Sequence, residues 1–351
     1  MNSKTCVLTS AGKSLLIKRP AFIAHRPLWK RALAFPLLLP LSIFVVVLSL
    51  TLSSFFFLRN KLWPTQSVQT AVSSTARFVA LNRFLATKLN LLEDYAAYDT
   101  LNFVLRSFAL VLHLQQLCFG KTIFSEFNNW FNFFFSRTIF FDDIVINAKH
   151  QQFVILGAGF DFRAHRLSLD EGCKVFEVDA LLTQQKKKEI VTKYSDHFSY
   201  EKHNKIEVHY ASVDFSKNEN FIEKIKEQGF DPSIPATVLM EGVTYYLEWE
   251  DLEKTLKQIA ESCAAGSLLT FDFSPKKFPE SLKATSKVGE PPKFGLDTNE
   301  TPHSKFLPLG FSSVEVWLGA EELFNRYAAR VENLHNKYSP LSTLNVCCLR
   351  V

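Results

Sequence analysis

Two glycines and an acid stand where a nucleoside could bind. A short apolar run stops at Gly157 and Gly159, and a second run, residues 174–178, ends in Asp179. A strand, a glycine turn and a helix start allow a ligand to approach backbone N–H groups. An acid at the tip of the second strand can accept both ribose hydroxyls of an adenosine. The spacing therefore predicts a nucleoside cofactor.

The turn lacks the third glycine of a dinucleotide site. In G-x-G-x-x-G that glycine lets the helix pack beneath a pyrophosphate, and here the position holds Phe162. The carboxylate of Asp161 would also repel a pyrophosphate. A cofactor with cationic groups, such as the sulfonium and ammonium of S-adenosyl-L-methionine, tolerates this acid. The pattern favours that cofactor over NAD, and an ordinary tight turn is the alternative.

The charge of the chain is unevenly distributed. The net charge is +5, but residues 1–31 carry seven basic residues and no acid. A basic tail on a nearly neutral remainder does not indicate a nucleic-acid partner. The six cysteines show neither paired spacing nor metal-ligand spacing, so we expect buried free thiols and no metal site.

A long uncharged segment follows the basic tail. Residues 32–58 contain no charged side chain and exceed the roughly 20 residues that cross a bilayer. We expect one transmembrane helix there and a single-pass membrane location. The basic tail favours export of the remainder. Because the cofactor is made inside the cell, we nevertheless expect the catalytic domain on the cytoplasmic side.

The remaining chain alternates short apolar runs with charged helical segments. Such alternation is typical of a parallel, doubly wound sheet. Two late runs, residues 313–318 and 344–351, are expected to form an antiparallel pair at one edge. The expected units are a basic tail (1–31), an anchor (32–58), a linker (59–69) and an enzyme domain (70–351), the last divided into a helical cap (70–150) and a Rossmann-like core (151–351).

Several motifs of residues 70–351 resemble the leucine carboxyl methyltransferase family, S-adenosylmethionine-dependent enzymes with bacterial and polyketide-pathway relatives. They are, in order, RTIFFDD, VILGAGFDFRAHRL, VFEVD, MEGVTYYL and VGEPPKFG. The resemblance implies a Rossmann-like methyltransferase domain that uses S-adenosyl-L-methionine.

The resemblance also implies roles for individual residues. Arg137 would bind the methionine carboxylate, Gly157 would offer a backbone contact, and Asp179 would hold the ribose. Asp214 and Phe215 would lie at the adenine, and Glu241 near the methionine amine. Together with Gly159 and Asp161, these are the candidate cofactor residues.

Each candidate has a plainer interpretation. Arg137 could be a surface arginine, Glu241 a capping acid, and Asp161 could form a structural ion pair with Arg163. No catalytic residue is evident, and Tyr245 or Tyr246 is the candidate because one of the two should face the cavity.

The predicted reaction is methyl transfer to an oxygen of a small molecule or of a protein carboxyl terminus. A carboxylate needs no general base, and the motifs show none, so a carboxylate is favoured over a hydroxyl. The alternatives are a catalytically silent, membrane-tethered nucleotide-binding domain and a nicotinamide-dependent reductase.

Overall fold

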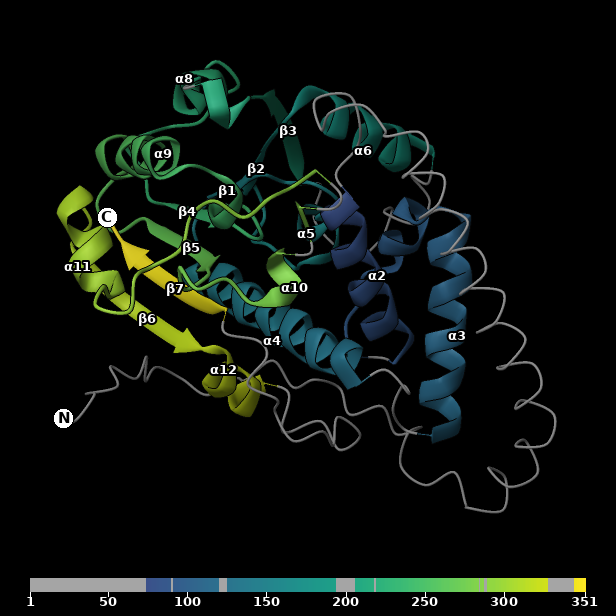
Figure 1. Ribbon diagram of the computed structural model, residues 1–351. Coiled ribbons are helices and arrows are strands. Elements are labelled where there is room, and N and C mark those ends of the chain that lie inside the picture. Colours follow the sequence, from purple (N-terminus) through teal and green to yellow (C-terminus); the bar gives the residue numbers. More distant parts are fainter. Residues whose placement is uncertain are drawn as a thin grey trace.

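A seven-stranded sheet forms the centre of the computed structural model, in the order β3-β2-β1-β4-β5-β7-β6 (Figure 1). The structure describes residues 74–89, 91–119, 125–193, 206–217, 219–283, 285–286, 289–327 and 344–351. The strands are β1 Gln152–Leu156, β2 Lys174–Asp179, β3 Glu207–Ser212, β4 Ala236–Met240, β5 Leu268–Phe273, β6 Ser313–Gly319 and β7 Asn345–Arg350.

The first five strands are parallel, and β7 is antiparallel to both β5 and β6. This confirms the predicted doubly wound sheet with its antiparallel edge. The strand order reverses between β1 and β4, because the chain leaves β1 towards β2 and β3 and later returns to β4. Open α/β sheets bind ligands at the carboxyl ends of the strands beside such a switch point.

Helices cover both faces of the sheet (Figure 1). On one face, α9 (Trp249–Ser262) buries Leu252, Leu256 and Ile259, which share one side of a helix, in a core with Val154 of β1. Next to it lie α8 (Phe221–Lys226) and α11 (Pro302–Phe306). On the other face, α4 (Ser125–Ala148) and α12 (Ala320–Tyr327) pack against alternate strand residues such as Phe153.

A separate group of helices lies to one side of the sheet, next to α6 and one end of α4 (Figure 1). It contains α2 (Ser74–Lys88), the 3-10 helix η2 (Tyr95–Thr100) and α3 (Phe103–Phe119). Their buried apolar residues share a core with Phe160 and Phe162, which follow the glycine turn. Phe162 thus packs against these three helices, which are called the cap below, at the position where a dinucleotide site has glycine.

Six further helices complete the described part of the chain. They are α5 (Arg163–Arg166), α6 (Leu181–Lys193), η3 (Phe215–Lys217), η4 (Thr244–Tyr246), α10 (Glu280–Lys283) and η6 (Leu307–Leu309).

The predicted fold class needs one correction. It included a transmembrane helix, and no helix in the described part of the chain is long and apolar enough to cross a bilayer. This holds for α3 as well, which is apolar but only 17 residues long. The segment expected to span the membrane, residues 32–58, lies outside the described residues. We therefore withdraw the transmembrane helix from the fold class, and the membrane localisation with it.

Candidate active site

A cavity of about 630 Å³ opens at the carboxyl ends of β1 to β4, at the switch point. Its volume is within the range of roughly 300–1,000 Å³ that is usual for small-molecule sites. Its wall includes most of the predicted cofactor residues together with both candidate tyrosines, namely Gly157, Gly159, Asp161, Asp179, Asp214, Phe215, Glu241, Tyr245 and Tyr246.

The N–H groups of the glycine turn bond to the end of β2. Gly157 and Ala158 donate to the carbonyl oxygen of Val178 over 2.8 and 3.1 Å, and Gly159 donates to Oδ2 of Asp179 over 2.5 Å. A dinucleotide site instead directs such N–H groups at a pyrophosphate. Because the turn has already used these donors, it offers little to a phosphate.

Asp179 is fixed by the backbone, and its side chain lines the cavity. Its Oδ1 accepts from the N–H of Ala180 over 2.6 Å, and its Oδ2 accepts from Gly159. Burial raises the pKa of Asp179, although these two N–H groups oppose the rise. A carboxylate has about four acceptor sites, so two remain for a pair of ribose hydroxyls.

Asp214 and Phe215 follow β3 and complete this side of the wall. Asp214 lies 3.1 Å from Nζ of Lys217, and the Phe215 ring lies 6.4 Å from that of Phe221. A flat aromatic side chain beside an acid suits an adenine, which can stack and donate its amino group.

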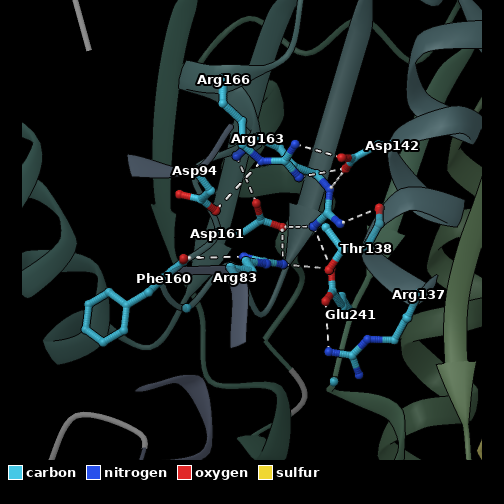
Figure 2. Close-up of polar contacts among 12 residues, drawn as sticks. Arg83, Asp94, Arg137, Thr138, Asp142, Phe160, Asp161, Arg163, Arg166 and Glu241 are labelled. Carbon is cyan, nitrogen blue, oxygen red and sulfur yellow. Dashed lines mark hydrogen bonds and ion pairs between the residues drawn. The ribbon is translucent and has the colours of Figure 1, made fainter. Parts of the chain in front are cut away.

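Glu241 lies among three guanidinium groups (Figure 2). Its Oε2 is 2.8 Å from Nη2 of Arg83 and 2.5 Å from Nη1 of Arg163, and its Oε1 is 2.8 Å from Nη2 of Arg137. Burial would raise the pKa of Glu241, but these three arginines lower it below its usual value. Glu241 is therefore an ionised carboxylate that lines the cavity.

Arg163 forms the centre of this ion network (Figure 2). Its side chain is fully buried and contacts Asp142 over 2.7 Å, Asp161, Glu241 and the carbonyl oxygen of Thr138. Arg166 adds a further contact to Asp142 over 2.7 Å. Asp161 and Arg163 therefore form the ion pair that was one interpretation of these residues. Asp161 also lines the cavity.

Arg137 lies behind the wall rather than on it. It is on α4, is fully buried, and contacts Asp272 over 2.6 Å and Glu241 over 2.8 Å. It is therefore not a surface arginine. In this arrangement it holds Glu241 in place, and its Nη1 also lies 3.5 Å from the hydroxyl of Tyr245.

Both candidate tyrosines reach the cavity, contrary to the expectation that only one of the two faces it. Their rings are 4.7 Å apart. Tyr245 donates to Oδ2 of Asp272 over 3.3 Å. Burial is the largest cause of a raised pKa at Tyr245 and at Tyr246. Both phenols therefore stay protonated and can donate hydrogen bonds, but neither is ready to take a proton.

Sequence reasoning missed two charged residues of the wall, Arg83 and Glu290. Arg83 is an arginine in a mostly apolar helix and pairs with Glu241 at the sheet. Glu290 belongs to the motif VGEPPKFG, which supports the family resemblance without indicating a role for its acid.

The sheet order and the cavity at its switch point define a Rossmann-like methyltransferase fold. A model of the leucine carboxyl methyltransferase family matches residues 75–260, more than half of the chain, so the protein belongs to that family. This confirms the family predicted from the motifs, and with it S-adenosyl-L-methionine as the cofactor.

Two curated relatives carry the name "Putative S-adenosyl-L-methionine-dependent methyltransferase". The protein from Mycobacteroides abscessus is 34% identical over 148 residues, which cover 41% of this chain and 47% of the relative. The protein from Mycolicibacterium gilvum is 29% identical over 175 residues, which cover 47% of this chain and 54% of the relative. The chain thus spans about half the length of the curated relatives it matches.

Among solved structures, a DUF574-family protein from Streptomyces avermitilis has a TM-score of 0.45 and 11% identity, covering 77% of this chain and 96% of that protein. This likeness is weak and adds nothing to the assignment.

Proposed function

We propose that the protein is an S-adenosyl-L-methionine-dependent O-methyltransferase. The observation that carries the proposal is the glycine turn, whose N–H groups bond to Val178 and Asp179 while Asp179 keeps free acceptor sites in the cavity. This arrangement suits a nucleoside without a pyrophosphate. The names of the relatives support the same class of activity.

The wall of the cavity fits a cationic cofactor. Its described ionisable residues include five acids and one guanidinium group, that of Arg83. Carboxylates near a sulfonium and an ammonium stabilise both charges. A nicotinamide dinucleotide would instead place two phosphates against Asp161 and the side chain of Phe162, which is buried in the cap core.

Each part of the cofactor has a proposed partner. Asp179 would bind the ribose, Asp214 and Phe215 the adenine, and Glu241 the methionine ammonium. The methionine carboxylate needs a cation. Arg83 is the guanidinium on the wall, and we assign this contact to it, whereas Arg137 would support Glu241 from behind.

The bound cofactor supplies an electrophilic methyl group on a sulfonium sulfur. The chain contributes position and exclusion of water, because methyl transfer requires the acceptor oxygen in line with the C–S bond. Arg83 joins α2 to Glu241 across the cavity and so fixes the cap over the reacting groups. Such closure also removes water from the nucleophile.

A transfer assay tests the proposal. The full-length protein, tritium-labelled S-adenosyl-L-methionine and a small-molecule extract of the producing cells should give a labelled, extractable product. Asp179→Ala should weaken cofactor affinity about 10- to 150-fold, because it removes a hydrogen bond to a charged group worth roughly 1.5–3 kcal/mol. Asp179→Asn should retain part of the affinity.

A protein that binds the cofactor but transfers no label to any extract fraction would indicate the catalytically silent alternative. Unchanged affinity in Asp179→Ala would contradict the proposed ribose contact.

A further inference from the structure

The switch point divides the cavity into two halves. The turn after β1 and the ends of β2 and β3 form the half assigned to the cofactor. The wall residues that follow Val243 after β4 and those after β5, together with residues such as Phe78 of α2, form the other half. This second half is the space left for the methyl acceptor, so the side chains that line it indicate the polarity and charge of that molecule.

The acceptor half is mainly apolar. Its wall includes Phe78, Val79, Phe134, Leu247 and Leu282. An apolar wall of this kind favours an acceptor with a hydrocarbon or aromatic body, because burial of apolar surface provides most of the binding free energy.

The acceptor half also lacks a cation for an anionic acceptor. Among the described wall residues, Arg83 is the single lysine or arginine. Its Nη2 lies 2.8 Å from Glu241 and 3.5 Å from Asp161, so it belongs to the cofactor half. A carboxylate acceptor would therefore meet no lysine or arginine counter-charge on the described wall of this half, and burial of an unpaired carboxylate is costly.

Glu290 is the acid of the acceptor half. The hydroxyl of Thr75, about two turns or ~12 Å from Arg83 along α2, donates to its Oε2. In the part of the chain that the structure describes, no lysine or arginine forms an ion pair with Glu290. Its negative charge repels a carboxylate and can accept a hydrogen bond from a hydroxyl.

We propose that the methyl acceptor is an uncharged, mostly apolar molecule that carries a hydroxyl, and that Glu290 determines this preference by accepting a hydrogen bond from the hydroxyl and repelling carboxylates. The inference rests on the proposed function and replaces the carboxylate favoured by the motifs. Tyr246, a protonated phenol beside Glu290, completes the polar part of this half.

Calorimetry with two matched probes tests the inference. The full-length protein is first saturated with S-adenosylhomocysteine and then titrated with 4-phenylphenol or with biphenyl-4-carboxylate. The neutral probe should bind at least roughly tenfold more tightly, because like charges oppose each other in a buried site. Glu290→Gln should reduce this preference to about threefold or less, mainly through tighter binding of the carboxylate.

Thr75→Val is the matched control, because it removes the hydrogen bond to Glu290 and keeps the charge. It should preserve the preference for the neutral probe. Equal or tighter binding of the carboxylate by the wild type, binding of neither probe, or the same loss of preference in both variants would overturn the inference. Failure to bind S-adenosylhomocysteine in the first step would contradict the proposed function instead.

Discussion

Replacement of Arg163 by methionine is expected to lower the free energy of unfolding by about 3–5 kcal/mol. The methionine side chain fills most of the volume but leaves Asp142, Asp161 and Glu241 without their shared cation in a buried environment. The loss of stability arises because buried carboxylates have lost an ion partner, and not because less apolar surface is buried. Urea unfolding of the variant and the wild type measures the difference.

Lys186→Met is the matched control for Arg163→Met. Lys186 lies 2.7 Å from Glu189, but the two side chains are 48% and 65% exposed. Exposed ion pairs contribute about 0–1 kcal/mol, so this variant should unfold almost as the wild type does. A similarly small change for Arg163→Met would show that the buried network does not stabilise the fold.

Gly157→Ala is expected to damage both the fold and the cofactor site. Gly157 has φ +66°, and an added Cβ would lie 2.3 Å from Cγ2 of Val243. The left-handed backbone costs an L-residue about 1–2 kcal/mol, and overpacking adds roughly 1–3 kcal/mol. If the turn moves to relieve the contact, Asp179 loses its position, so the affinity for S-adenosylhomocysteine should fall as well.

Two further variants separate the causes of this loss. Gly172 has φ +79°, but the nearest atom to a Cβ there would be 3.9 Å away. Gly172→Ala should therefore lower the free energy of unfolding only through the left-handed backbone, and cofactor affinity should not change. Val243→Ala, combined with Gly157→Ala, should recover part of the lost stability and affinity. Equal losses in Gly157→Ala and Gly172→Ala would mean that the close approach to Val243 is unimportant.

The sheet was predictable from the sequence because parallel strands are buried on both faces. Four of the five residues in 152–156 and four of the six in 268–273 are apolar, and β1 and β5 occupy these ranges. The carboxyl ends of parallel strands meet at one edge, so Gly157, Asp179 and Glu241 could be placed in one site before any contact was known.

The ion partners of the site could not be predicted in the same way. Arg137 contacts Asp272, and Arg83 contacts Glu241, although each pair is separated by more than 100 residues of chain. Neither periodicity nor spacing encodes such a pairing, which depends on how the cap and α4 pack against the sheet. The position of Arg137 behind Glu241 and the presence of Arg83 on the wall therefore required the structure.

The central claim is that the glycine turn and Asp179 bind a nucleoside with a sulfonium group rather than a dinucleotide. Titration calorimetry of the full-length protein with S-adenosylhomocysteine, and separately with NAD, tests this claim most directly. We expect saturable binding of S-adenosylhomocysteine at one site and no measurable binding of NAD, because the N–H groups of the turn already bond to β2. Binding of NAD with comparable affinity would contradict the account.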